Sequence, residues 1–269
     1  MIQGFIVWFL KISPKTKRWF WRFWYDLFAQ KSGFHKFRFM NYGYAEQGFS
    51  LSLLEQDEDE RYPLQLYHHT ATQINITNKK ALEVGSGRGG GASYLQRYLK
   101  TSSFTGVDIS EKAISLCKNS FNISGLHFEK ADSENLPFES STFDVVINIE
   151  SSHCYGNIDK FISEVFRVLK DDGVFLWCDF RTHEEMKKLF LLFKESGFKV
   201  IKEKNITKNV IEALNMVTSI RKKQINKYIP KLMRNVFTSY AGIKGGSVYD
   251  AFLNDSLVYK SAALKKTNI

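Results

Sequence analysis

The chain reads Leu82-Glu83-Val84-Gly85-Ser86-Gly87-Arg88-Gly89-Gly90-Gly91 where a short apolar run, residues 81–84, meets a helix-like segment, residues 92–99. Glycines at this junction let the backbone turn with a positive φ and let a ligand approach the main chain closely. The start of the following helix offers unpaired N–H groups to a negatively charged group. The stretch therefore predicts a strand, a tight turn and a helix that together bind a ligand.

A carboxylate ends the second apolar stretch of the chain. Residues 104–107 are followed directly by Asp108. A carboxylate at the end of that predicted strand is placed to accept hydrogen bonds from a ribose diol. Together the glycines and Asp108 predict half of a nucleoside-cofactor site, which makes the chain a candidate enzyme.

The glycine spacing alone does not identify the cofactor. Gly85, Gly87 and Gly90 also satisfy the G-x-G-x-x-G pattern of dinucleotide-binding proteins, which is a weak signal by itself. Glu83 argues against NAD, because a carboxylate two residues before the first glycine would lie near a cationic ligand rather than a pyrophosphate.

Apolar runs and helical segments alternate along the rest of the chain, as expected for a parallel sheet. Strands are expected near residues 80–84, 104–108, 126–130, 144–149, 173–179, 198–204 and 257–264, and helices near 64–73, 92–100, 111–121, 158–170 and 184–196. A helical insertion at 205–235 precedes the last strand. The pattern predicts an α/β, Rossmann-like, doubly wound and mostly parallel seven-stranded sheet with an N-terminal helical cap.

The motifs after the second strand resemble those of the class I S-adenosylmethionine (SAM) methyltransferases. They are Ala131-Asp132, Leu136-Pro137-Phe138 and the segments 143–147 and 166–175, and with the glycines they cover about residues 79–181. The resemblance implies a class I methyltransferase fold with SAM as cofactor. It assigns Glu83, Gly85, Gly87 and Gly89 to the methionine end, Asp108 to the ribose, and Asp132 with Ser133 to the adenine. Ser86, Ile109 and Asn148 complete the expected cofactor-binding set.

The loop after the fourth predicted strand is expected to face the transferred methyl group, because ligands of open α/β sheets bind at the carboxyl ends of the strands. It reads Glu150-Ser151-Ser152-His153-Cys154-Tyr155. A histidine with a pKa near neutrality can accept the proton that a hydroxyl acceptor loses, which makes His153 a candidate general base. The alternative for His153 is a loop histidine that caps backbone groups. Glu150, the second catalytic candidate, could orient His153, hold the cationic end of the cofactor or cap a turn.

Four stretches together resemble a narrower family, the phthiotriolone/phenolphthiotriolone dimycocerosates methyltransferases and related fatty-acid and polyketide O-methyltransferases. They are residues 39–44, 83–94, 150–155 and 179–181, and the likeness covers about residues 36–265. It implies O-methylation of a hydroxyl or carboxyl group on a hydrophobic lipid- or polyketide-like molecule, with Tyr42, Tyr44 and Tyr155 in the substrate pocket. The methyltransferase domain would then span residues 36–269, with cap or lid regions at 36–78 and 205–235.

Two other functions remain open. One is C-methylation of a sterol- or quinone-like lipid, which would use an acid such as Glu150 rather than a histidine base. The other is a non-catalytic, membrane-associated protein that keeps only SAM binding. The intact set of Glu83, the glycines and Asp108 argues against the second.

The composition of the 269 residues excludes several classes of protein. With 43% hydrophobic residues the chain can bury a full core, yet no window of about 18 apolar residues predicts a membrane-spanning helix. Cys117, Cys154 and Cys178 are scattered, so we expect neither a disulfide framework nor a metal site, and a reducing cytoplasm fits best. The adjacent pair His68-His69 does not share a helix face and is interpreted as surface or packing histidines.

Most of the net charge of +10 lies in the first 40 residues, which hold eight Lys or Arg residues against one acid, Asp26. A helix is expected from Ser13-Pro14 to Gly33, with basic residues on one face and aromatic residues on the other. This amphipathic segment, residues 1–35, either packs as a cap helix or lies in the headgroup layer of a membrane through residues 1–34. The charge requires no nucleic-acid partner. We expect a cytoplasmic protein with peripheral contact to the inner face of a membrane, and the sequence leaves the oligomeric state open.

Overall fold

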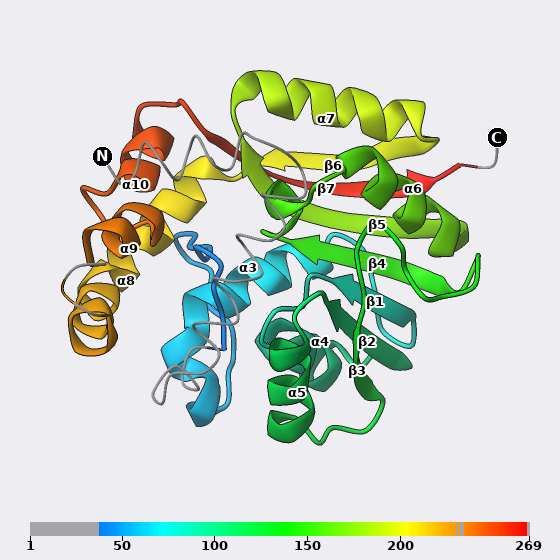
Figure 1. Ribbon diagram of the computed structural model, residues 1–269, viewed down its shortest axis with the longest axis horizontal. Coiled ribbons are helices and arrows are strands. Elements are labelled where there is room, and N and C mark those ends of the chain that lie inside the picture. The colour runs from blue at the N-terminus through cyan, green and yellow to red at the C-terminus, as the bar shows by residue number, and fades with distance from the viewer. Residues whose placement is uncertain (1–37, 230, 232–233, 268–269) are drawn as a thin grey trace.

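The computed structural model describes residues 38–229, 231 and 234–267, so the predictions for residues 1–35 lie outside the described residues. Within them the chain forms a seven-stranded sheet in the order β3-β2-β1-β4-β5-β7-β6 (Figure 1). The strands are β1 (Lys80–Val84), β2 (Ser103–Asp108), β3 (Leu126–Lys130), β4 (Phe143–Ile149), β5 (Leu169–Arg181), β6 (Phe198–Asn205) and β7 (Val258–Lys266). Neighbouring strands are parallel except for β7, which runs antiparallel between β5 and β6. The predicted doubly wound, mostly parallel α/β sheet is confirmed.

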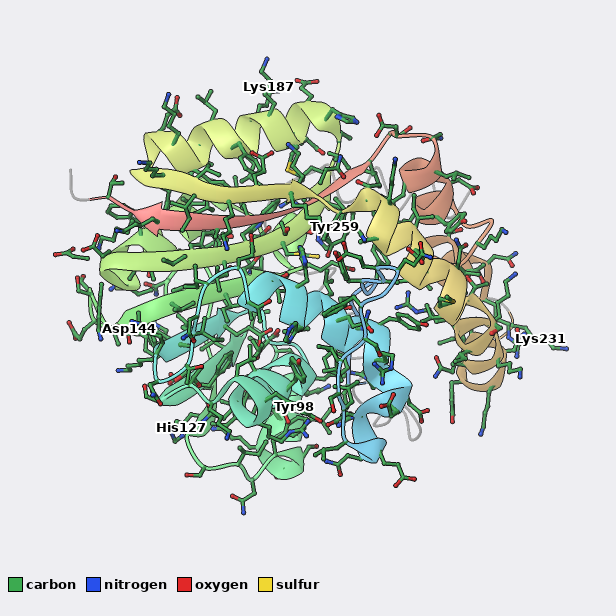
Figure 2. The ribbon with its side chains drawn as sticks, turned by 180° about the vertical axis from the view of Figure 1, so that it is seen from behind. Tyr98, His127, Asp144, Lys187, Lys231 and Tyr259 are labelled. Atoms are coloured by element: carbon green, nitrogen blue, oxygen red, sulfur yellow. The ribbon has the colours of Figure 1, made fainter. Side chains whose placement is uncertain are left out.

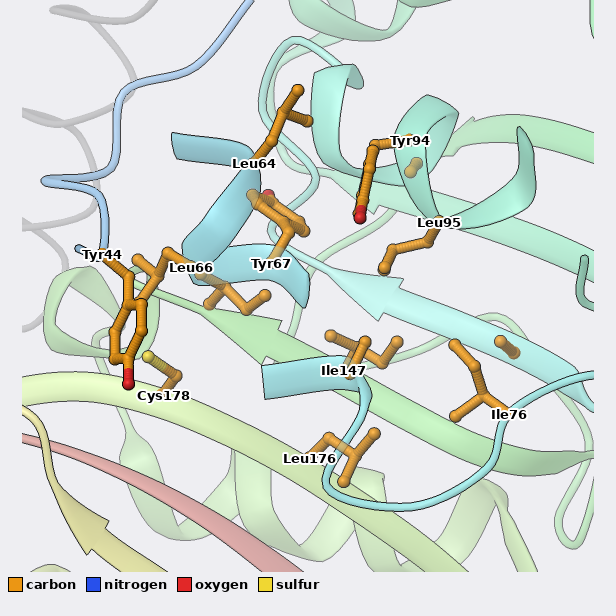
Figure 3. Close-up of a cluster of buried hydrophobic side chains, with 14 of the residues drawn as sticks. Tyr44, Leu64, Leu66, Tyr67, Ile76, Tyr94, Leu95, Ile147, Leu176 and Cys178 are labelled. Carbon is orange, nitrogen blue, oxygen red and sulfur yellow. The ribbon is translucent and has the colours of Figure 1, made fainter. Parts of the chain in front are cut away.

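Helices cover both faces of the sheet. One face carries α3 (Arg61–Ala71), α4 (Gly90–Leu99) and α5 (Glu111–Ser120), and the other carries α6 (Ile158–Val168) and α7 (His183–Glu195). Successive side chains of a strand point to opposite faces, so Ala81 of β1 packs in the first core while Leu82 packs in the second. Figure 3 shows part of the first core, where Leu66 of α3 and Ile147 of β4 belong to the same buried cluster.

Side-chain caps fix where three of these helices begin. Ser110 accepts a hydrogen bond from the Ala113 N–H before α5, and Asn157 accepts one from the Lys160 N–H before α6. Thr182 forms a capping box at the start of α7. Such caps satisfy N–H groups that the first helical turn cannot pair. The loops between these helices and the preceding strands are therefore held in place.

The cap is built from two segments that lie far apart in the chain. The first contains residues 39–45, here called the strap, and the 3-10 helix η2 (Glu55–Glu60); the second contains α8 (Thr207–Tyr228), α9 (Arg234–Tyr240) and α10 (Ser247–Leu253). The Ala45 N–H donates to the Asn209 carbonyl of α8, and the Arg221 guanidinium donates to the Asn41 carbonyl. The two predicted cap regions therefore meet.

Two element boundaries differ from the sequence prediction. The helix predicted over 158–170 ends at Val168, and β5 begins at Leu169. Leu169 is fully buried and pairs with Phe143 of β4, so sheet pairing and burial override a local pattern that favours helix. The insertion before the last strand continues to Leu253, beyond the predicted end at residue 235. Among the helices of the described residues, none is long and apolar enough to cross a membrane.

Candidate active site

The glycine loop follows β1 and leads into α4, as predicted. Gly85, Gly87 and Gly89 have positive φ angles of 81°, 53° and 75°, a region that side chains with a Cβ rarely adopt. The N–H groups of Gly85 and Ser86 donate to the Val107 carbonyl at the end of β2, which ties the loop to the neighbouring strand. At Gly87 an added Cβ would meet only the Met40 Cε atom, at 3.7 Å. Gly87 therefore leaves space on the side from which a ligand would approach.

Gly91 provides space for an aromatic side chain of the protein itself. A Cβ at Gly91 would overlap the aromatic ring of Tyr67, which belongs to α3. Because Gly91 lacks that atom, the Tyr67 ring packs against the start of α4 and its hydroxyl donates to Glu83 Oε1 at 2.7 Å. The third glycine of the triplet thus allows Tyr67 of α3 to reach the carboxylate of Glu83.

Glu83 is a fully buried carboxylate with an incomplete set of partners. Its Oε1 atom accepts the Tyr67 hydroxyl, while its Oε2 atom has no hydrogen-bond partner among the described residues. Burial raises the pKa of Glu83 to about 8, with the Tyr67 hydrogen bond opposing and Asp108 adding to the shift. A cation placed beside Oε2 would lower this pKa and compensate the buried charge.

Two more buried polar atoms near the same loop lack partners among the described residues, namely Ser86 Oγ and Asn148 Oδ1. Buried polar groups without partners are costly in a folded protein, and they point to a ligand or solvent that completes them. With Glu83 Oε2, they offer acceptors for the ammonium group and the sulfonium charge of SAM. The residues present therefore fit the methionine end of the cofactor.

The carboxyl ends of β2 and β3 bring together the residues predicted for the nucleoside. Asp108 Oδ2 accepts the Gly87 N–H, and Oδ1 accepts the Ser110 N–H, each at 2.9 Å. Ile109 follows Asp108, and the Ala131 N–H donates to the Asp108 carbonyl, which places Asp132 and Ser133 at the adjacent strand end. The structure thus gathers these four predicted residues at one edge of the sheet. Asp108 also fixes the glycine loop, a role that the sequence did not reveal.

Tyr155 lies against the cofactor half-site. Asn148 Nδ2 contacts the Val84 carbonyl, Ser151 Oγ and Tyr155 Oη at 2.8, 2.8 and 2.9 Å. A Cβ at Gly85 would collide with the Tyr155 hydroxyl. The structure therefore places Tyr155, predicted for the substrate pocket, beside the turn after β1.

His153 forms a dyad with Asp179, the residue that follows Cys178 near the end of β5. His153 Nδ1 lies 2.8 Å from Asp179 Oδ1, and the His153 N–H donates to Asp179 Oδ2 at 2.9 Å. The Ser152 hydroxyl donates to Oδ2 at 2.6 Å, and Arg181 Nη1 lies 3.1 Å from the same oxygen. The carboxylate is fully buried, whereas the His153 side chain keeps 22% of its surface exposed. Asp179 thus fixes the imidazole while its ring remains accessible.

The dyad has shifted protonation equilibria. Burial lowers the pKa of His153, but the neighbouring Cys154 and Asp179 raise it more, to about 10. Burial raises the pKa of Asp179, but His153 and Arg181 outweigh it and hold that pKa well below its usual range. At neutral pH the pair is therefore an imidazolium and a carboxylate, and it becomes a base only when a proton leaves His153.

Glu150 lies in the same loop but does not bond to the imidazole. Its Oε2 atom accepts the Tyr42 N–H from the strap and the Tyr259 hydroxyl from β7, both at 2.8 Å. Its φ of 48° is unusual for a residue with a side chain. Burial raises the pKa of Glu150 to about 8, while Tyr42, His153 and Tyr259 lower it and Asp179 raises it. The carboxyl group joins the strap to the last strand beside the dyad.

Aromatic side chains surround the dyad and come from several elements. The Phe180 ring lies 4.6 Å from the His153 ring and 5.5 Å from the Tyr42 ring, measured between centroids. Phe252 of α10 and Tyr259 of β7, which is labelled in Figure 2, lie within 6 Å of Phe180. We call Tyr42, Phe180, Phe252 and Tyr259 the aromatic wall. It gives the dyad apolar surroundings suited to a hydrophobic molecule.

Tyr44 does not join the aromatic wall, although the sequence grouped it with Tyr42. Its ring stacks on His69 at 4.4 Å, and its hydroxyl bonds to Glu46. Figure 3 shows Tyr44 beside the core of α3 and β5. His69 also bonds to Ser261 and is a packing histidine in the structure, as interpreted from the sequence.

Several site residues were not identified from the sequence. Asp179 was noticed only as part of a motif, and Tyr67 and Tyr259 gave no local signal because their partners lie in distant segments. The position of Asp179 near the end of β5, next to β4, is the one signal that could have found it. Among the described residues, no group of histidines, cysteines and acids could hold a metal ion.

Comparisons with known proteins identify the family of the chain. Residues 76–235 match the family model described as a methyltransferase domain. The chain is 35% identical to a phthiotriol/phenolphthiotriol dimycocerosates methyltransferase of Mycobacterium leprae, over 91% of this chain and 92% of that protein. It is 36% identical to a fatty-acid O-methyltransferase of Mycolicibacterium smegmatis, over 75% of this chain and 74% of that protein.

A solved structure extends the likeness to the fold. A sarcosine dimethylglycine methyltransferase from Galdieria sulphuraria matches with a TM-score of 0.72 at 15% identity, over 87% of this chain and 96% of that one. At this sequence identity the match shows a shared fold alone. The family is therefore assigned from the sequence matches. The residues that fit the methyl donor are those of the cofactor half-site. The chain belongs to the SAM-dependent methyltransferases, in the family that includes the phthiotriol/phenolphthiotriol dimycocerosates methyltransferases, and SAM is its methyl donor.

Proposed function

We propose that this methyltransferase acts on an oxygen atom, a hydroxyl or a carboxyl, of a hydrophobic lipid- or polyketide-like molecule. The observation that carries the proposal is the His153–Asp179 pair, with 2.8 Å between Nδ1 and Oδ1, set against the aromatic wall. A fixed imidazole can accept the proton of a hydroxyl acceptor, and apolar surroundings can bind a hydrophobic one. The names of the two sequence relatives, a phthiotriol and a fatty-acid methyltransferase, support the same substrate class.

We propose for the cofactor-binding residues the same roles that the sequence predicts. Glu83 with Ser86 and Asn148 would hold the methionine end, where their orphan oxygens lie. Gly85, Gly87 and Gly89 would let the cofactor approach the backbone, and Asp108 with Ile109 would meet the ribose. Asp132 and Ser133 would meet the adenine. When bound, SAM supplies a methyl group on a positively charged sulfur, a good leaving group for in-line displacement.

His153 would remove the proton of the acceptor hydroxyl as the oxygen attacks the methyl carbon. Asp179 holds the imidazole in one orientation and stabilises the imidazolium that forms, as the carboxylate does in histidine-based triads. The His153 pKa of about 10 means that the base form of the imidazole accumulates above neutral pH. A carboxylate acceptor is already deprotonated, so its methylation needs the site for binding and orientation alone.

C-methylation is a second candidate, and Glu150 is the observation that favours it. Its carboxyl group lies within the site, bonded to Tyr42 and Tyr259 of the aromatic wall. A carboxylate among aromatic faces could stabilise a carbocation and accept a proton from carbon. This reaction would depend on Glu150 and tolerate the loss of His153.

Product analysis distinguishes these reactions. Purified protein is incubated with deuteromethyl-labelled SAM and either long-chain alcohols or fatty acids. O-methylation gives an ether that resists alkali or an ester that alkali cleaves, whereas C-methylation places the label on carbon. A label on carbon only would overturn the proposed O-methylation.

Membrane contact through residues 1–34 and a location at the inner face of a membrane are also proposed. The support is the basic and aromatic composition of that segment, because the segment lies outside the described residues. Deleting residues 1–34 should weaken co-sedimentation with anionic liposomes and spare SAM binding. Loss of the cooperative melt in the truncated protein would instead identify the segment as a packed cap.

A further inference from the structure

One side of α8 carries exposed apolar and basic residues in a line. Met216, Ile220, Lys223 and Lys227 follow one another at spacings of four, three and four residues, which places them on one face of the helix. All four are exposed, and Met216 and Ile220 each keep 54% of their surface accessible. We call these four residues the outer stripe.

The opposite side of α8 faces the rest of the cap. Leu214 and Ile225 are buried there, and Arg221 donates to the Asn41 carbonyl of the strap. The strap continues into Tyr42, whose N–H bonds to Glu150. The outer stripe therefore lies on the reverse of a helix whose inner side contacts the segment beside the dyad.

The cap around the outer stripe is strongly basic. Between residues 213 and 249 the sequence contains no Asp or Glu, and its basic residues are Arg221, Lys222, Lys223, Lys227, Lys231, Arg234 and Lys244. Glu212, one turn before Met216, is the nearest acid on the N-terminal side. Figure 1 shows α8, α9 and α10 gathered at one side of the molecule, and Figure 2 places Lys231 at the outer end of this group.

The lysines of this face have no acidic partner within the part of the chain that the structure describes. Lys222, Lys223 and Lys227 are exposed and form no ion pair there, whereas Lys188 on α7 pairs with Glu184 and Lys260 pairs with Glu203. An unpaired group of lysines next to exposed methionine and isoleucine offers both charge and apolar surface to an external partner.

We propose that the outer stripe docks the protein on an anionic lipid surface. Helices that lie in a headgroup layer combine apolar side chains with lysines, and each lysine gains from the negative surface potential. A second copy of the chain would place like charges opposite one another. A nucleic acid would leave Met216 and Ile220 without an apolar partner. This surface is distinct from residues 1–34, and docking would bring the cap to the layer where a hydrophobic molecule resides.

Sedimentation of the full-length protein with vesicles tests the proposal. We expect binding to vesicles of phosphatidylcholine mixed with phosphatidylglycerol, weakened by salt, and little binding to phosphatidylcholine alone. Lys223→Glu/Lys227→Glu should lower the apparent affinity by about tenfold or more. Met216→Ser/Ile220→Ser should remove the part of the binding that persists at high salt.

Matched controls lie on α7, on the other side of the molecule. Lys187→Glu/Lys194→Glu makes the same change of charge at two exposed lysines, and Leu191→Ser removes an apolar side chain with 55% of its surface exposed. Both controls should bind vesicles like the wild type. All variants should keep the wild-type melting temperature and SAM affinity, because the exchanged side chains are exposed and lie outside the cofactor half-site.

Three results would overturn the proposal. Wild-type vesicle binding by both outer-stripe variants would assign membrane contact to another segment, such as residues 1–34. Equal losses in the α7 control would show that only overall charge matters. The third result has two parts: the wild type does not bind vesicles, and it binds an oligonucleotide or forms a dimer in a way that the outer-stripe variants abolish. That result would assign the surface to a different partner. None of these measurements uses a methyl acceptor, so they are independent of the proposed reaction.

Discussion

The imidazole of His153 and the carboxylate of Asp179 lie 2.8 Å apart, although His153 belongs to the loop after β4 and Asp179 to β5. β4 and β5 are neighbours in the sheet, and the pairing of Ile149 with Cys178 sets Asp179 opposite the loop that carries His153. Asp179 is therefore the residue that orients the histidine, and Glu150, one of the candidates for that role, bonds elsewhere.

Replacing Asp179 with Asn should keep the shape of the site and remove its negative charge. We expect kcat for a hydroxyl acceptor to fall by about 10²- to 10⁴-fold, because the imidazolium that forms is no longer stabilised. SAM affinity, measured by calorimetry, should stay close to that of the wild type. A kcat within a few-fold of wild type would show that Asp179 serves only the fold.

The pH dependence of the reaction should show the shifted pKa of His153. The base form accumulates as pH rises toward about 10, so kcat with a hydroxyl acceptor should increase above neutrality rather than level off near pH 7. Besides Cys154, it is Asp179 that raises this pKa, so the rising limb of Asp179→Asn should move to lower pH. The limb should be absent in His153→Ala and with a carboxylate acceptor. If the rising limb of Asp179→Asn lies at the same pH as that of the wild type, Asp179 does not set the pKa of His153.

Glu83 should release a proton when SAM binds. Its pKa of about 8 means that the carboxyl group is mostly neutral at pH 6 to 7, and a bound cation favours the carboxylate. SAM affinity should therefore rise between pH 6 and pH 7.5. Calorimetry in buffers of different ionisation enthalpy measures the released proton directly. Glu83→Gln should bind SAM more weakly, and its SAM affinity should not change between pH 6 and pH 7.5. If this variant releases the same number of protons as the wild type, the proton comes from another group.

Tyr67→Phe should weaken SAM binding through the loss of its hydrogen bond to Glu83. The change leaves Glu83 Oε1 without its donor, and an unsatisfied buried polar group costs about 1–3 kcal/mol. Tyr98→Phe is the matched control, because the Tyr98 hydroxyl donates to the buried Asp57 carboxylate away from the site. The control should lower the melting temperature but keep SAM affinity. Equal affinities in the two variants would mean that Tyr67 is a packing residue only.

Asp108→Ala should lower SAM affinity by about 2–4 kcal/mol, because two ribose hydroxyls lose a charged acceptor and such losses are not additive. The loop also loses the bond between the Gly87 N–H and Asp108. Asp144→Ala is the comparison, since Asp144 accepts the Lys80 N–H at the opposite end of the sheet. Undiminished affinity in Asp108→Ala would remove this residue from the cofactor site.

The sheet and the cofactor half-site could be predicted because their signals are local. The glycines, Glu83 and Asp108 each stand at the end of an apolar run, and the chain order of parallel strands then brings those ends to one edge. The boundary between α6 and β5 could not be predicted in the same way. Leu169 belongs to the strand because it pairs with Phe143 and is buried, and neither fact is visible in the local pattern.

The substrate side of the site depends on contacts between distant segments. Tyr42 and Tyr44 are two residues apart and would lie on the same side of a regular extended strand. Gly43 between them has a φ of 90°, which interrupts the extended conformation, and Tyr42 belongs to the aromatic wall while Tyr44 stacks on His69. Glu150 bonds to Tyr259, more than a hundred residues later in the chain. Such partners follow from the position of β7 in the sheet, which a single sequence does not reveal.

Mass spectrometry of a lipid extract, incubated with the purified protein and deuteromethyl-labelled SAM, tests methyl transfer to oxygen most directly. We predict that a hydrophobic hydroxyl- or carboxyl-bearing lipid gains one deuteromethyl group on oxygen, and that a hydroxyl acceptor loses this product in His153→Ala and Asp179→Asn. SAM binding without any labelled lipid, or a label found on carbon and retained in both variants, would contradict the account.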